Sequence, residues 1–177
     1  MDAMVNVQGF GGDLQALLAD TYNLLASANL TVHPSVCRIT LHGSRGLAGD
    51  FRPDSDIDLS LLVQVAPLTN RAELATLLHE VLSKTLHNWR SPVQPDVAAI
   101  FDIQDCGLRC FELTSYKPEF CSLGRINCCG IYKVQGDTEG FIDNIEVDIA
   151  KMYPCWTVWE NPSGDEPPAS RGPDIAV

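Results

Sequence analysis

The sequence has few basic residues, no long apolar run and no internal repeat. Twelve lysines and arginines stand against 23 aspartates and glutamates, which gives a formal net charge of −11 over 177 residues. Nonspecific binding to nucleic acid depends on lysine and arginine side chains that neutralise phosphates. The composition therefore argues against a duplex or a long single strand as the partner of this protein.

The sequence also has little that would direct it to a membrane. No stretch approaches the roughly 18 consecutive apolar residues of a membrane span. The first residues, Met-Asp-Ala-Met, lack the basic and apolar regions of a signal peptide. With 45% hydrophobic and 20% charged residues, the composition is that of a globular domain able to bury a core. We expect a cytoplasmic protein without membrane contact.

Cysteine, by contrast, is abundant. Without a secretory signal a disulfide framework is not expected, and the spacings do not form a paired C-x2-C zinc pattern. We expect buried thiols that pack as small apolar side chains. A structural zinc held by Cys106, Cys110, Cys121 and Cys128 is the alternative. The seven cysteines lie at positions 37, 106, 110, 121, 128, 129 and 155.

A glycine-serine turn followed by two alternating aspartates is the main motif of the chain. An apolar strand is predicted to end at Gly43-Ser44, and a second strand over 56–63 carries Asp56 and Asp58. Side chains alternate along a strand, so the two carboxylates share a face. Such a pair repels unless it is neutralised, and oxygen ligands suit Mg²⁺ or Mn²⁺. Backbone N–H groups at a turn where a helix starts bind phosphate, so the motif predicts a nucleoside triphosphate site.

The run His-Gly-Ser-Arg over 42–45, followed by Ser-Asp-Ile-Asp-Leu over 55–59, resembles the nucleotidyltransferase superfamily related to DNA polymerase β. Within that superfamily, these two motifs are most similar to those of the small minimal nucleotidyltransferase branch, and the resemblance covers residues 10–103. It implies an α+β fold in which helices pack on a mixed β-sheet. It also implies that Asp56 and Asp58 are metal ligands, and that Gly43 and Ser44 hold the β- and γ-phosphates.

The resemblance further implies a third carboxylate on a later strand. We favour Asp96, which comes shortly after the preceding helix, with Asp102 as the alternative on the same strand face. Arg45 follows Ser44 directly, where a guanidinium could pair with triphosphate oxygens, although a surface position is an equal alternative. His42 could contact nucleotide or pack at the strand end. Lys133 could reach the site from a later strand, but nothing in the sequence places it there.

Together these features predict a metal-dependent nucleotidyltransferase. Mg²⁺ or Mn²⁺ would be the cofactor, a nucleoside triphosphate, with ATP expected, would be the donor, and a hydroxyl of a small molecule or a protein would be the acceptor. One alternative is an antitoxin-like regulatory protein that AMPylates or sequesters a partner protein. Others are a nucleotide-binding module without turnover, a fold with lost activity, and a solvated acidic edge strand beside an ordinary turn.

The remaining patterns predict the organisation of the chain. We expect a nucleotidyltransferase core over 1–105, a β-rich extension of the same domain over 106–159 and a disordered tail over 160–177. The aromatic segment 152–159 is expected to cap the core or to make a homodimer contact, with base stacking as the alternative. Helices are predicted from Gly12 to Leu25, briefly within 44–55, and from the Asn70–Glu73 capping box to Trp89. Strands are predicted over 37–41, 56–63, 97–103, 108–113, 126–134 and 141–149.

Overall fold

Strands from both halves of the chain form one six-stranded mixed sheet. The computed structural model describes residues 3–65, 70–102, 129–136, 139–142 and 155–163. In the sheet the strand order is β7-β6-β5-β4-β3-β8, and β4 and β5 are its parallel pair while the other neighbours are antiparallel. A separate two-stranded sheet pairs β1 with β2. The strands are β1 (Val5–Asn6), β2 (Thr31–Val32), β3 (Val36–His42), β4 (Ile57–Val63), β5 (Pro95–Asp102), β6 (Cys129–Lys133), β7 (Gly140–Phe141) and β8 (Trp156–Glu160), and the helices are α1 (Gly12–Leu17), α2 (Ala19–Ser27) and α3 (Arg71–Asn88).

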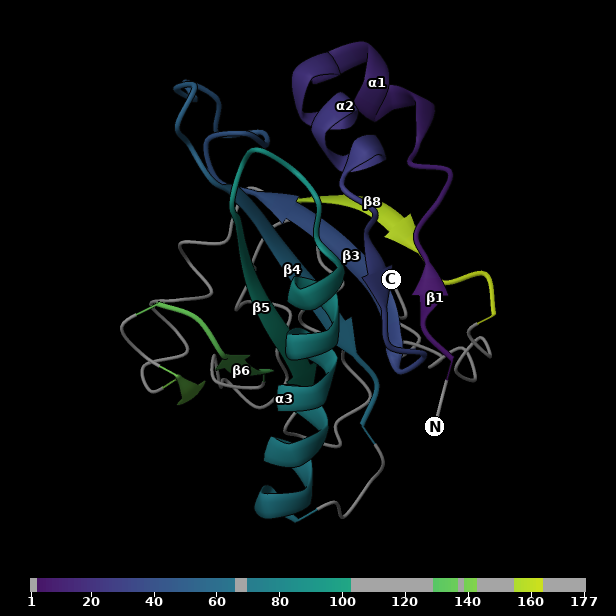
Figure 1. Cartoon of the computed structure of the whole chain (residues 1–177), viewed down its shortest axis with the longest axis vertical. Helices are drawn as coiled ribbons and strands as arrows, with labels where there is room; N and C mark the ends of the chain where they lie inside the picture. Colours follow the sequence, from purple (N-terminus) through teal and green to yellow (C-terminus); the bar gives the residue numbers. More distant parts are fainter. Residues whose placement is uncertain (1–2, 66–69, 103–128, 137–138, 143–154, 164–177) are drawn as a thin grey trace, which may run out of the picture.

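One face of this sheet forms the hydrophobic core with α3. Alternating residues of the central strands point to the same side, as the period of two predicts. Figure 1 shows α3 lying across this face of the sheet, while α1 and α2 lie together near one end. The core residues on the three central strands are Val36, Ile39, Leu41, Ile57, Leu59, Leu61, Val63, Val97, Ala99 and Phe101, and those on α3 are Leu78, Val81 and Leu82.

The helix α3 is the crossover that makes β4 and β5 parallel. Its predicted start is confirmed, because Asn70 Oδ1 accepts a hydrogen bond from the Glu73 N–H at 2.9 Å. The helix ends before Trp89, whose indole N–H donates to the Val93 carbonyl at 2.9 Å. Among the described residues, no helix is both long enough and apolar enough to cross a membrane.

The single N-terminal helix that the apolar spacing predicts is instead two helices. Leu18 separates α1 from α2 with φ −133° and ψ 59°, outside the helical region. The break allows Leu14 and Leu25 to be buried together, whereas Leu17 is 70% exposed. The period of 3.6 residues predicts that the segment is helical, but it could not locate the change of helix axis within it.

The strands of the second half extend the same sheet on both sides of β3–β5. β6 and β7 follow β5 at one edge, and β8 pairs with β3 at the other. Trp159 on β8 is buried in the core, which confirms the core interpretation of the aromatic segment for this residue. Several predictions lie outside the described residues: the strand over 108–113, most of the strand over 141–149, the four cysteines of the zinc alternative, and the tail from residue 164.

We expect Leu82→Ala to lower the free energy of unfolding by about 2–5 kcal/mol, because Leu82 is fully buried between α3 and the sheet. The matched control is Leu17→Ala on α1, which should change it by less than about 0.5 kcal/mol because that side chain is exposed. Urea denaturation followed by circular dichroism measures both. Equal losses for the two variants would contradict this packing.

Candidate functional site

Gly43, at the end of β3, lies directly against the carboxylate of Asp58. Gly43 has φ +72°, and a Cβ built on it would stand 2.0 Å from Asp58 Oδ2. Neither the backbone angle nor the space admits a side chain. The β3–β4 register explains the contact, because His42, the residue before Gly43, is paired with Asp58. The glycine and the aspartate of the motif, fifteen positions apart, therefore meet at one point.

The chain after Gly43 forms two consecutive tight turns in place of the predicted short helix. The Gly46 N–H donates to the Gly43 carbonyl at 3.0 Å, and the Gly49 N–H donates to the Gly46 carbonyl at 3.3 Å. A Cβ on Gly46 would stand 3.0 Å from the His42 carbonyl oxygen, so this turn folds back tightly over the end of β3. Any anion binding here would depend on N–H groups of a turn rather than of a helix.

Asp58 and Asp96 are direct neighbours on the parallel strands β4 and β5. Adjacent strands lie about 4.8 Å apart and paired residues share a face, so the two carboxylates project side by side. Asp56 is exposed and lies just before β4 begins at Ile57. The alternative third carboxylate, Asp102, belongs to the other end of β5, about 20 Å along the strand from Asp96. The structure thus brings Asp96, and not Asp102, beside Asp58.

The electrostatics of this group reflect burial first and the crowding of negative charge second. Burial, followed by the charges of Asp96 and Asp56, raises the pKa of Asp58 from 3.8 to about 6, and Lys133 opposes the shift. Burial lowers the pKa of His42 to about 4, so its imidazole is neutral at pH 7. The His42 Nε2 atom lies 2.9 Å from Ser60 Oγ, which is fully buried. His42 is therefore a neutral, hydrogen-bonded group at the strand end.

Two residues of the later chain fix Asp96 in place. Lys133 on β6 forms an ion pair with Asp96, and the two side chains are 24% and 39% exposed. Beyond β6, the Gln135 side-chain carbonyl accepts from the Val97 N–H at 2.8 Å, and its amide donates to the Pro95 carbonyl at 3.1 Å. The Gln135 amide thus replaces a backbone partner on both sides of Asp96. Sequence reasoning gave Lys133 no position and missed Gln135.

The donor set fits a hard divalent cation in its chemistry, since it consists of carboxylate oxygens held beside a tight turn. As they stand, however, no three histidine, cysteine, aspartate or glutamate side chains of the described residues are grouped so that they could hold a metal ion. Asp96 is engaged by Lys133 in this arrangement. A cation shared by all three carboxylates would need side-chain movement at this point.

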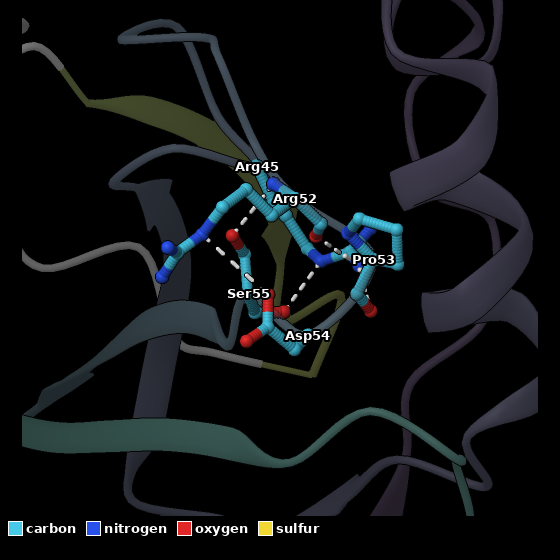
Figure 2. Close-up of polar contacts among 5 residues, drawn as sticks. All are labelled: Arg45, Arg52, Pro53, Asp54 and Ser55. Atoms are coloured by element: carbon cyan, nitrogen blue, oxygen red, sulfur yellow. Dashed lines mark hydrogen bonds and ion pairs between the residues drawn. The ribbon is translucent and has the colours of Figure 1, made fainter.

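Arg45 has different partners from the predicted phosphate. Its side chain is buried, with the residue 4% exposed. Figure 2 shows it among residues 52–55: Nε donates to the Ser55 carbonyl at 2.7 Å, and Nη2 donates to the carbonyls of Arg52 and Pro53, each at 3.2 Å. The guanidinium also lies 4.6 Å from the centre of the Phe51 ring. Arg45 therefore holds the loop between β3 and β4. Because the residue is buried, the alternative prediction of a surface position for Arg45 is wrong.

The backbone of Arg45 is held as well, from the opposite side. The buried Thr21 hydroxyl on α2 donates to the Arg45 carbonyl at 2.7 Å. Within the loop, the Arg52 N–H donates to Ser55 Oγ at 2.8 Å and the Ser55 N–H donates to the Arg52 carbonyl at 3.0 Å. The turn at Gly43 and the start of β4 are therefore connected by a short, internally bonded loop.

Comparison with known proteins adds no relative: neither the family models nor the curated proteins that were searched match this chain.

Gly43→Ala should destabilise the protein more than Gly49→Ala does. Both glycines have the same left-handed backbone, φ +72° and +73°, but a Cβ on Gly49 has nothing within 4 Å. The Gly49 variant measures the backbone penalty alone, about 1–2 kcal/mol. The Gly43 variant must in addition displace the Asp58 carboxylate, which should add more than about 1 kcal/mol. Urea denaturation measures the difference. It should shrink in an Asp58→Ala background, where the carboxylate is gone but the Cβ of residue 58, 3.1 Å from the added Cβ, remains, as a double-mutant cycle would show.

Asp58→Asn should stabilise the protein at pH 7 when a chelator is present. The folded state holds the Asp58 proton up to a pKa of about 6, above the ordinary value of 3.8. Between pH 3.8 and about pH 6 the unfolded state binds fewer protons than the folded state, so ionisation of Asp58 lowers the free energy of unfolding as the pH rises through this range. The gain from the substitution should be full above pH 6 and vanish near pH 4. Asp54→Asn, at a carboxylate whose side chain is 77% exposed, is the control and should show no such profile.

Proposed function

We propose that the protein transfers a nucleoside monophosphate from a nucleoside triphosphate to a hydroxyl group of a small molecule or of a protein. The observation that carries the proposal is the contact between the Gly43 turn and Asp58, with Asp96 on the neighbouring strand. A phosphate chain placed at the turn would have the carboxylates directly beneath it. This is the arrangement that the resemblance to nucleotidyltransferases implies for Gly43, Ser44, Asp56, Asp58 and Asp96.

The topology supports the same proposal. A hairpin of β3 and β4 carries the turn and the first aspartates, and α3 then crosses over to the parallel strand β5 with the third. The resemblance implies a nucleotidyltransferase fold with helices packed on a mixed sheet, and the observed α+β arrangement is consistent with that expectation. In this proposal the strands β6, β7 and β8 are additions to that core, because they join its two edges.

In the proposed reaction the chain's own residues act mainly by position and charge. The turn at Gly43 and Ser44 would hold the triphosphate in line for attack on the α-phosphate. Asp56, Asp58 and Asp96 would hold Mg²⁺ or Mn²⁺, which when bound neutralises the phosphates and lowers the pKa of the acceptor hydroxyl. Asp96 would also orient the acceptor hydroxyl or take its proton. Arg45 would act indirectly, by holding the conformation of the loop rather than by contacting phosphate.

The acid–base properties of the site agree with this division. Burial, followed by the neighbouring carboxylates, raises the pKa of Asp58 to about 6, and perturbed carboxyl groups of this kind are common at functional sites. His42 is neutral at pH 7 and donates to, or accepts from, Ser60. We therefore give His42 no part in proton transfer and assign it to the packing of the strand end.

Calorimetric titration with ATP, GTP, CTP and UTP, with and without Mg²⁺, tests the proposal. We expect binding of at least one triphosphate that requires Mg²⁺ and that weakens more than about tenfold in Asp58→Asn, a loss of about 1.4 kcal/mol or more. Asp54→Asn, at a nearby exposed carboxylate, should bind as the wild type does. Absence of binding to all four triphosphates would contradict the proposal.

Pyrophosphate release separates the enzyme from its alternatives. A nucleotidyltransferase supplied with its acceptor releases one pyrophosphate for each nucleotide transferred. Metal-dependent binding without release in the presence of cell extract would favour a nucleotide-binding module without turnover. Label from [α-³²P]ATP that appears on one protein of the extract would favour the regulatory protein that AMPylates a partner.

A further inference from the structure

The ion pair between Lys133 and Asp96 links the extension of the sheet to the row of carboxylates. Lys133 is fixed at its backbone on β6, where it pairs with Gly140 of β7. Its ammonium group reaches Asp96 on β5 and lies close enough to Asp58 and His42 for its charge to influence both. One lysine therefore offsets part of the negative charge that three carboxylates bring together.

We propose that Lys133 occupies the cation's place at Asp96 and must leave it for a divalent cation to bind. The inference rests on the proposed function, because it takes Asp56, Asp58 and Asp96 as the ligand set. Its basis is that a positive group, the Lys133 ammonium, is already bound to Asp96 and close enough to Asp58 to act on its charge. Binding of the cation is then an exchange, in which the carboxylate of Asp96 loses an ammonium and gains a metal ion.

The two partners of the ion pair differ in how firmly they are held. The backbone on both sides of Asp96 is fixed by the Gln135 amide, through the Val97 N–H and the Pro95 carbonyl. The ammonium of Lys133 sits at the end of a flexible four-carbon chain. We therefore expect the Lys133 side chain to move when the cation binds, while Asp96 stays beside Asp58.

An exchange of this kind predicts that removal of the lysine tightens cation binding. We would titrate the full chain with Mn²⁺ and follow the free ion by electron paramagnetic resonance, without nucleotide. Lys133→Met should bind Mn²⁺ several-fold more tightly than the wild type. The matched control is Lys84→Met, which removes a lysine from an equivalent ion pair with Glu80 on α3 and should leave Mn²⁺ affinity unchanged.

A second measurement uses the unaltered protein and does not depend on the folding of a variant. The rate of acylation of each lysine by an N-hydroxysuccinimide ester can be followed by mass spectrometry. Saturating Mn²⁺ should accelerate the modification of Lys133, because its amine is released from Asp96. Modification of Lys84, whose partner is remote from the carboxylates, should not change.

The outcomes separate this inference from the proposed function. If the wild type binds Mn²⁺, but Lys133→Met binds it equally or more weakly and Lys133 acylation does not respond to Mn²⁺, the exchange is wrong and the metal site stands. If neither the wild type nor Lys133→Met binds Mn²⁺ at millimolar concentration, both are wrong. Tighter binding in Lys133→Met together with Mn²⁺-accelerated acylation of Lys133 supports the exchange.

Discussion

The close approach of the Asp58 carboxylate to Gly43 is the constraint on which the rest of the site depends. The Asp58 Oδ2 atom lies only 2.0 Å from the point where any other residue at position 43 would carry its Cβ, and the backbone there is left-handed. The approach requires that β3 and β4 keep a register in which His42 faces Asp58. A slip of one residue would turn every side chain of the strand to the other face and separate the two groups. The buried alternation of both strands against α3 prevents that slip.

The same constraint gathers charge at a single point. Asp58 is pressed against backbone with Asp96 on the next strand and Asp56 two residues before it, and the protein as a whole carries a formal charge of −11. Functional sites are often less stable than the scaffold that holds them, because groups placed for chemistry repel one another. Here the hydrophobic face between the sheet and α3 stabilises the fold, whereas the repulsion among the carboxylates on the opposite face destabilises it.

The sequence predicts the part of the site that depends on local pattern. Alternating apolar residues gave the strands around the motif, and the Asn70–Glu73 cap gave the start of α3. The predictions of one continuous N-terminal helix and of a short helix after Gly43 were wrong. The break at Leu18 and the turns after Gly43 are each set by packing rather than by periodicity. Gly43 and Asp58 are identified from their motif and Asp96 from the third carboxylate that the resemblance implies, and the structure brings Asp96 beside Asp58.

Lys133 and Gln135 could not be placed from sequence, because their position follows from the pairing of β6 with β5 between residues about 30 positions apart. Arg45 was assigned from its proximity to Ser44 alone. Its direction depends on a loop that folds back over it, and the spacing of residues carries no information about that direction. Long-range register and the course of a loop are thus the two properties that the sequence pattern leaves undetermined.

The buried guanidinium of Arg45 has a consequence for how the loop between β3 and β4 can vary. Its hydrogen bonds go to main-chain carbonyls of residues 52, 53 and 55, and none of these contacts involves a side chain of the loop. Substitutions at Arg52 or Pro53 would leave the same carbonyls in reach, whereas a single insertion or deletion would move all three. The loop is therefore strict in length and tolerant in composition at positions 52 and 53, whereas Phe51 contacts the guanidinium and the Ser55 hydroxyl accepts from the Arg52 N–H. Homologous proteins with this arginine should keep the spacing between the turn and the aspartates while residues 52 and 53 vary.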